Sequence, residues 1–133
     1  MKYILDTHAL LWYLNDDENL SEKAHKIIDT EDCFYCKVSL WEIAIKQSLG
    51  KLKYKSSIPE IVEMCRQENF LSIPVTENHI EQIKTLDFIH RDPFDRLIIC
   101  QALADDIGKI AELERRIGAA EKTIHSPQIR NRN

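Results

Sequence analysis

The chain has 133 residues, of which 44% are hydrophobic and 30% are charged, and its formal net charge is −4. This length suits one domain with a real core, and this composition excludes a disordered chain. The negative net charge excludes a global basic field that would attract nucleic acid. A bound polyanion would therefore need local Lys or Arg side chains or a metal ion. We expect one domain over residues 1–125 and a frayed tail over residues 126–133.

The amino-terminal residues carry no recognisable targeting signal. Residues 1–6 lack the apolar region of a signal peptide, and no apolar run in the chain approaches membrane-spanning length. We therefore expect a cytoplasmic protein.

Apolar runs typical of strands alternate with amphipathic helical patterns through the first hundred residues. The patterns predict strands at residues 2–5, 33–38 and 70–75, and helices that begin near Thr7, Ser21, Ser39, Pro59, Thr76 and Pro93. Gly50 follows the third of these helices as a typical carboxyl-terminal glycine. Strands separated by helices indicate βαβ crossovers. We therefore expect an α/β fold with three layers, α/β/α, around a short parallel sheet.

The pattern changes after Asp106. Apolar residues then recur every three to four positions among Glu, Lys and Arg, from Ile110 through Leu113 and Ile117. This spacing is typical of an amphipathic helix. We expect residues 109–122 to be helical and to form a helical carboxyl-terminal end.

The four cysteines include a CxxC pair, Cys33 and Cys36, whose spacing also occurs in redox and zinc sites. In a strand, however, residues three apart point to opposite faces of the sheet. A second CxxC or a histidine pair that would complete a zinc site is missing from the sequence. We therefore expect buried, reduced thiols.

Four acidic residues stand where helices are predicted to begin. Asp6 ends the first strand, Glu42 lies in the first turns of the third helix, and Asp92 and Asp95 flank Pro93. Each has a structural explanation, because Ser39-x-x-Glu42 reads as a capping box and aspartates stabilise helix starts. Taken singly, each acid is better explained by capping than by catalysis.

Taken together, the acids indicate a metal site. In parallel α/β sheets, ligands bind outside the carboxyl ends of the strands, where the following helices start. Carboxylates gathered at one edge repel one another unless a cation lies between them, and Mg²⁺ and Mn²⁺ prefer oxygen ligands. We therefore expect Asp6, Glu42, Asp92 and Asp95 to converge at a site for a hard divalent cation.

Three segments carry a family likeness. They are residues 5–12 (LDTHALLW), residues 38–46 with 49–52 (VSLWEIAIK and LGKL), and residues 90–97 with 101–102 (HRDPFDRL and QA). Their order and spacing resemble the PIN-domain family, and most closely the VapC-type ribonuclease toxins of type II toxin–antitoxin systems. The resemblance spans residues 1–106.

The resemblance implies a Mg²⁺- or Mn²⁺-dependent endoribonuclease. By that resemblance Asp6, Glu42 and Asp95 are the catalytic, metal-binding acids, and Asp92 is an additional acid of this subgroup. It also implies RNA as substrate, a small antitoxin protein as partner and a homodimer. Family members usually continue with a strand followed by Thr-x-Asp, whereas this chain has no aspartate after Asp106.

That missing aspartate leaves an alternative open, a PIN-like scaffold that binds RNA or a protein partner but cleaves poorly. Aspartyl-phosphate hydrolases also begin with an aspartate after the first strand, but they need a second acid two residues later, where this chain has His8. We exclude that class.

Other polar and aromatic residues have weaker claims to the site. Lys46 is expected to pair with Glu42 one helical turn earlier rather than to bind phosphate. His8 and His90 lie beside site aspartates as candidate bases, which metal-activated water does not require. Arg91 and Arg96 are expected either to contact substrate or to balance the local acids. Trp12 and Trp41 are expected to lie in the core or to face a partner.

Overall fold

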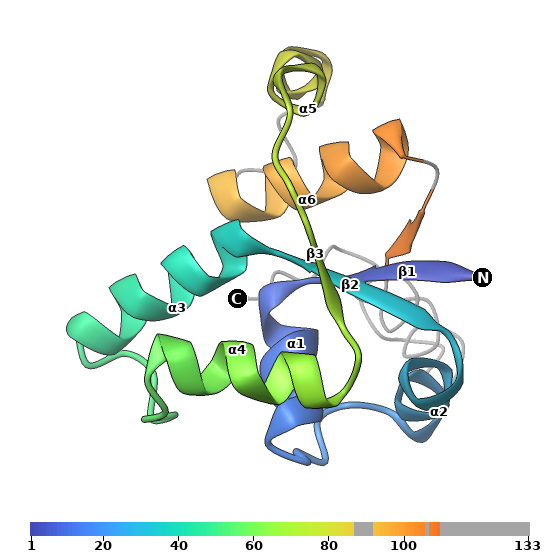
Figure 1. The fold of residues 1–133 in the computed structure, drawn as a ribbon. Helices are drawn as coiled ribbons and strands as arrows, with labels where there is room; N and C mark the ends of the chain where they lie inside the picture. Colours follow the sequence, from blue (N-terminus) through green and yellow to red (C-terminus); the bar gives the residue numbers. More distant parts are fainter. Residues whose placement is uncertain (87–91, 106, 110–133) are drawn as a thin grey trace, which may run out of the picture.

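A computed structural model describes residues 1–86, 92–105 and 107–109. The strands in these residues form one parallel sheet in the order β3-β2-β1-β4 (Figure 1). They are β1 (Lys2–Leu5), β2 (Asp32–Cys36), β3 (Leu71–Ile73) and β4 (Gly108–Lys109).

Helices cover both faces of the sheet. They are α1 (Thr7–Leu14), α2 (Glu22–Thr30), α3 (Lys37–Ser48), α4 (Ile58–Gln67), α5 (Glu77–Gln82), the 3₁₀ helix η1 (Ile83–Thr85) and α6 (Pro93–Ala104). Figure 1 shows α1, α2 and α4 on one side of the sheet and α6 on the other. The predicted three-layer α/β/α fold with a parallel sheet is therefore confirmed.

Most helices begin directly after the capping residues that the sequence predicted. Asp6 caps α1 and Ser21 caps α2, each accepting a hydrogen bond from a backbone N–H in the first turn. Thr76 caps α5, and Asp92 caps α6 with Pro93 directly after it. These caps satisfy amide groups that have no partner inside the helix, so they stabilise helix starts locally.

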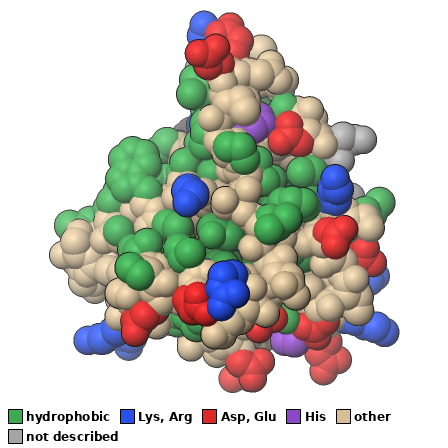
Figure 2. Space-filling view, viewed as in Figure 1, with side chains coloured by type: hydrophobic (Ala, Val, Ile, Leu, Met, Phe, Trp, Pro, Cys, Tyr) green, Lys and Arg blue, Asp and Glu red, His purple; other side chains and the backbone are tan. Residues whose placement is uncertain are grey.

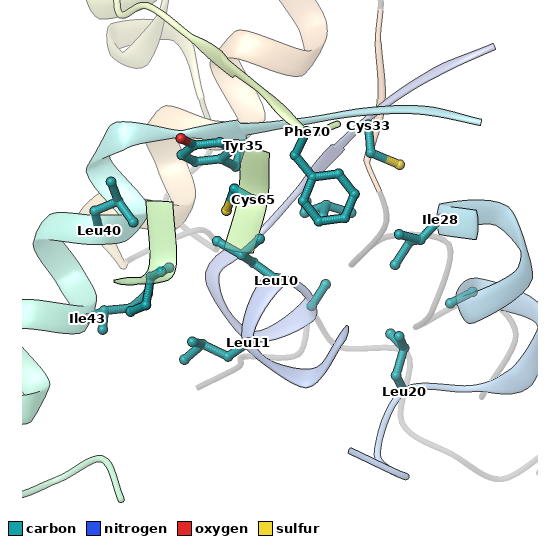
Figure 3. Packing of buried hydrophobic residues seen from close by; sticks show 14 residues of the cluster. Leu10, Leu11, Leu20, Ile28, Cys33, Tyr35, Leu40, Ile43, Cys65 and Phe70 are labelled. Atoms are coloured by element: carbon teal, nitrogen blue, oxygen red, sulfur yellow. The ribbon is translucent and has the colours of Figure 1, made fainter. Parts of the chain in front are cut away.

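The larger core lies between the sheet and the helices α1, α2, α3 and α4 (Figure 1). It contains Leu5 of β1 and Tyr35 of β2, packed against buried side chains of α1, α2, α3 and α4. Figure 3 shows labelled side chains from these elements pointing into one interior. A smaller core on the opposite face contains Ile4 of β1 and Ile98 of α6. Consecutive residues of β1 thus serve opposite faces, as the pleat of a strand requires.

The two cysteines of the CxxC pair also lie on opposite faces. Cys33 belongs to the larger core and Cys36 to the smaller one, and both thiols are free and buried. Burial raises the pKa of Cys33 to about 12 and that of Cys65 to about 11, so these thiols stay protonated at neutral pH. The prediction of buried, reduced cysteines is confirmed for all four.

A buried histidine holds α5 against the far end of α6. His79 is 2% exposed, and its Nδ1 accepts a hydrogen bond from the backbone N–H of Thr76 at 3.0 Å. Because Nδ1 accepts, the hydrogen of a neutral ring is on Nε2, which donates to Asp105 at 3.2 Å. Asp105 directly follows α6 as its carboxyl-terminal cap residue, so this contact helps to position the helix whose first turn contains Asp95.

Two predicted boundaries are wrong at the junction between β2 and α3. β2 ends at Cys36 rather than Val38, and α3 begins at Lys37 with Cys36 as its cap rather than at Ser39. The third strand is also shorter than predicted, ending at Ile73 before Pro74, which has no N–H for a sheet hydrogen bond.

The predicted helix over residues 109–122 is wrong at its first residue. Lys109 lies in β4, where it pairs in parallel with Ile4 while Gly108 pairs with Tyr3. Pairing with an existing strand satisfies the backbone groups of this short segment, which the apolar periodicity of the sequence could not reveal. Residues 110–122 of that prediction, the tail at 126–133, His90 and Arg91 lie outside the described residues.

Within the part of the chain that the structure describes, no helix combines the length and apolar character needed to cross a membrane.

We predict that Gly108→Ala destabilises the protein by crowding Tyr3. A Cβ at Gly108 would lie 2.9 Å from two carbons of the Tyr3 ring, which is closer than van der Waals contact. Overpacking of this kind typically costs about 1–3 kcal/mol. In urea unfolding, Gly108→Ala should lower the free energy of unfolding by less in a Tyr3→Val background, which lacks the ring. An equal cost in both backgrounds would exclude Tyr3 as the cause and count against the pairing of β4 with β1.

Candidate active site

A small pocket lies at the carboxyl end of β1, between the first turns of α1 and α6 and the amino-terminal half of α3. Its lining consists of Asp6, Thr7, His8, Glu42, Asp92, Asp95 and Ile98. The structure therefore brings the four acids singled out in the sequence to one pocket. Its volume of about 10 Å³ leaves room for roughly one water-sized particle.

Asp6 is held at this pocket by its place between β1 and α1. Its backbone is extended, and its Oδ1 accepts a hydrogen bond from the N–H of Ala9 at 2.8 Å. The residue is 3% exposed. A carboxylate has two oxygens and about four lone-pair directions, so one capping bond does not prevent it from binding a cation as well.

Glu42 is oriented by two partners rather than by the predicted capping box. Its Oε1 accepts a hydrogen bond from the hydroxyl of Thr7 at 2.7 Å, and its Oε2 lies 2.8 Å from Nζ of Lys46. Because α3 begins at Lys37, Glu42 lies beyond its first turn and caps nothing. The capping explanation of this acid is therefore wrong, and the expected pair with Lys46 is confirmed.

Ser39 completes this arrangement instead of capping α3. It is fully buried, and its Oγ lies 2.9 Å from Oγ1 of Thr7. Thr7 has a single hydroxyl hydrogen, which it donates to the Glu42 carboxylate, so the hydrogen between the two hydroxyls comes from Ser39. A chain of hydrogen bonds from Ser39 through Thr7 to Glu42 thus connects α3 with α1.

Asp92 and Asp95 come from the start of α6. Oδ1 of Asp92 accepts hydrogen bonds from the backbone N–H groups of Phe94 at 2.9 Å and Asp95 at 3.4 Å. Asp92 is exposed and Asp95 is half-buried. Negative charge is favoured at both positions, because the amino terminus of a helix carries partial positive charge.

The donor set of the pocket suits a hard divalent cation. All four acids offer carboxylate oxygens, the ligands that Mg²⁺ and Mn²⁺ prefer. Over the described ranges, no three His, Cys, Asp or Glu side chains are grouped as the ligands of one metal ion. The chemistry of the residues therefore fits such an ion, while their side chains are not gathered around a single point.

Two further residues considered for the site, His8 and Arg96, each make a contact with another helical residue. His8 lines the pocket and stacks on Trp12 with ring centroids 5.7 Å apart, while Trp12 itself packs against the larger core. Arg96 donates a hydrogen bond to the backbone oxygen of Ile83 at 2.9 Å, which ties α6 to η1.

Sequence reasoning missed Thr7 and the aromatic pair of Trp41 and Phe94. Thr7 follows Asp6 directly, but its partners lie 32 and 35 residues away, so no local signal marks its role. Trp41 is 63% exposed and meets Phe94 edge-on at 5.3 Å between ring centroids. The residues that follow these two aromatics, Glu42 and Asp95, are both site acids, so the contact joins α3 to α6 beside the pocket.

We predict that Lys46→Met destabilises the protein by removing the cationic partner of a buried carboxylate. A hydrogen bond to a charged group contributes about 1.5–3 kcal/mol, and the loss should fall near the lower value because the Lys46 side chain is 30% exposed. In thermal unfolding, Lys46→Met should cause a smaller loss of stability in a Glu42→Gln background, where the carboxylate charge is absent. Lys84→Met, which removes an exposed pair with Glu81, is the matched control and should cost less than about 0.5 kcal/mol. Equal losses at the two lysines would contradict the prediction.

Comparison with known proteins gives one match. The family model described as the PIN domain matches residues 3–122. No curated protein and no solved structure matches the chain. Because the matched segment covers most of the 133 residues and includes all four pocket acids, the chain belongs to the PIN domain family, whose members are typically metal-dependent nucleases.

Proposed function

We propose that this protein is a Mg²⁺-dependent endoribonuclease and the toxin of a type II toxin–antitoxin pair. The observation that carries the proposal is the convergence of four carboxylates, from three separate segments, on one pocket at the carboxyl end of β1. Membership of a nuclease family supports the reaction class. The likeness of the three motif segments to VapC-type toxins supports RNA as substrate and the toxin role.

In this proposal Asp6, Glu42 and Asp95 hold the cation, Mg²⁺ or Mn²⁺, with Asp92 as an additional ligand. The bound ion would supply Lewis-acid chemistry, orienting the scissile phosphate and lowering the pKa of a water nucleophile. The chain itself arranges the acids. Thr7 directs one oxygen of Glu42, and Asp6 is held by its bond to Ala9.

Lys46 has a second role in the proposal. With no cation bound, its ammonium group offsets the charge of Glu42 in a pocket that three other carboxylates share. The starts of α1 and α6 also favour negative charge at Asp6 and Asp95. These contacts offset part of the repulsion among the four carboxylates that line the pocket.

A toxin of this kind needs a small antitoxin, and we further propose that the protein forms a homodimer in the cytoplasm. Exposed apolar side chains offer surface for such partners. Among the described residues, the most exposed large apolar side chains, apart from Met1, are Trp41, Leu49, Leu71, Ile80 and Leu103. Figure 2 shows hydrophobic side chains over much of the visible face, interrupted by few charges near its centre.

We predict that Asp6→Asn and Asp95→Asn each abolish metal-dependent RNA cleavage while the protein stays folded. Asparagine caps helices about as well as aspartate, and loss of charge at a helix start costs only about 0.3–1 kcal/mol. Loss of a metal ligand, in contrast, removes the catalyst. Cleavage of total RNA with Mg²⁺ or Mn²⁺, and with EDTA as the blank, measures the effect.

The matched control for this experiment is Asp16→Asn, which makes the same chemical change outside the pocket. Asp16 has a positive φ of 52°, a conformation that asparagine adopts readily, so this variant should fold and cleave as the parent does. Parental cleavage by the Asp6 or Asp95 variant would exclude the proposed site.

We predict that millimolar Mn²⁺ or Mg²⁺ raises the melting temperature and that EDTA reverses the rise. An ion that binds only the folded state stabilises it by RT ln(1 + [L]/Kd), about 2.7 kcal/mol at one hundred times Kd. Asp6→Asn should lose most of the rise, whereas Asp16→Asn should keep it. An unchanged melting temperature in the parent protein would mean that the pocket does not bind the ion at these concentrations.

We predict that expression of the protein alone slows bacterial growth. Co-expression of a small open reading frame adjacent to its gene should restore growth, because an antitoxin that covers the acid pocket blocks access of RNA. Asp95→Asn should remove the growth defect without lowering the amount of protein. Normal growth with abundant parent protein would contradict the toxin role.

A catalytically weak scaffold that binds RNA or a protein partner is the second candidate. The observation that favours it is the lack of any aspartate after Asp106, where the family likeness implies a fourth acid. The scaffold predicts RNA binding without cleavage at any metal concentration, whereas the nuclease predicts cleavage that Asp6→Asn abolishes. The cleavage assay therefore separates the two candidates.

A further inference from the structure

The segment between α3 and α4 carries three regularly spaced lysines, Lys51, Lys53 and Lys55. All three are exposed, whereas Leu52 and Tyr54 between them are half-buried and pack against the larger core. Alternation of this kind is typical of an extended backbone, in which every second side chain points to the same side. The three ammonium groups therefore face solvent together, and we name these residues the lysine strip.

The backbone of the lysine strip is anchored. Nε2 of Gln47, in the last turn of α3, donates hydrogen bonds to the carbonyl oxygens of Tyr54 and Ser56, both at 2.9 Å. Gly50 makes the turn out of α3 with a φ of +71°, a conformation that glycine adopts without strain. The strip therefore presents its charges from a positioned backbone, which reduces the entropy lost when a ligand binds.

The lysine strip is a local positive field on a negative protein. Three positive charges lie within five residues of a chain whose net charge is −4. None of the ion pairs found among the described residues involves these lysines. Figure 2 shows Lys or Arg side chains at the lower left, where Figure 1 places the connection between α3 and α4.

An open hollow adjoins the lysine strip. Lys53, Tyr54, Lys55 and Ser56 line it together with Asn15 and Glu60. Glu60 is the acid in this lining, and its Oε1 accepts a hydrogen bond from the backbone N–H of Ser57 at 2.7 Å, within the capping box of α4. The hollow thus offers a ligand two ammonium groups and neutral polar groups beside the Glu60 carboxylate, of which Oε1 is engaged in the capping box.

We propose that the lysine strip binds the phosphate backbone of single-stranded RNA, an inference that rests on the proposed ribonuclease function. Alternate residues of an extended chain lie about 6.6–6.8 Å apart, which is about twice the rise of 3.4 Å per nucleotide of a stacked strand. The charges are therefore spaced to meet a row of phosphates. Lys side chains bind phosphates as point charges without selecting a sequence.

The composition of the lysine strip favours RNA over a protein partner. Protein interfaces are poor in lysine and rely on buried aromatic or aliphatic anchors. Here the apolar side chains, Leu52 and Tyr54, turn inward and leave only charges on the outer side. This pattern matches an electrostatic contact with a polyanion.

α3 connects the lysine strip with the acid pocket. Glu42 lies six residues before Ser48, the last residue of α3, and a helical rise of 1.5 Å per residue makes this about 9 Å along the helix axis. That length corresponds to about three stacked nucleotides, and the lysine strip begins three residues beyond Ser48. RNA with one phosphate at the pocket would therefore reach the strip a few nucleotides away.

The test measures binding of a short unstructured RNA in EDTA, so that cleavage plays no part. The parent is compared with the triple variant K51Q/K53Q/K55Q and with the matched control K23Q/K26Q/K84Q, which removes the same charge from exposed lysines on α2 and η1. Between about 50 and 200 mM salt, loss of three phosphate contacts should reduce the slope of log K against log salt by about 2. The control should keep the parental slope, and melting curves verify that each variant is folded.

Several results would overturn the proposal. They are parental RNA affinity and slope in the strip variant, an equal loss in the control variant, and no RNA binding by the parent. Parental RNA binding together with loss of a protein partner would assign the strip to that partner instead. The proposed function is tested separately. If the parent protein binds RNA through the lysine strip but never cleaves it with Mg²⁺, RNA binding by the strip is supported and the nuclease function is excluded.

Discussion

The burial of one charged carboxylate, that of Glu42, constrains the arrangement of the whole site. A charge that is 4% exposed must be compensated, because the interior solvates it poorly. Lys46 provides the opposite charge from the next turn of α3, and Thr7 provides a hydroxyl hydrogen from α1. The second contact crosses between helices, so the requirement to satisfy Glu42 also keeps α3 beside Asp6.

Capping and site formation use the same residues without conflict. Asp6 and Asp92 each satisfy backbone N–H groups at a helix start, and those helices begin where strands or loops reach one edge of the sheet. Because a carboxylate has two oxygens, a cap leaves capacity for another ligand. The parallel sheet then gathers the capped helix starts, which turns separate structural acids into the lining of a shared pocket.

Negative and positive charges lie near opposite ends of α3. Near its first turns, four carboxylates line a pocket of about 10 Å³, where their negative charge repels a polyanion. Beyond its last turn, exposed lysines form a positive row with no described ion pair of their own. The net charge of −4 averages over both regions and therefore conceals the local field.

Sequence alone was sufficient where the determining interactions are local. Asp6 before α1 and Asp92-Pro93 at α6 were read correctly, because a cap bonds to an N–H two or three residues away and proline fixes its own φ. The three layers followed from alternation of strand and helix patterns. The four acids could be named because each stands beside such a signal.

Tertiary structure decided what depends on distant partners. Ser39 reads as a helix cap, but the cap is Cys36, and Ser39 instead meets Thr7, which is 32 residues earlier in the chain. Gly108 and Lys109 stand where the predicted helix begins, yet they form a strand because β1 offers unpaired backbone groups along its edge. Pairing with a distant strand outweighs local periodicity there, since the hydrogen bonds it supplies do not exist until the sheet has assembled.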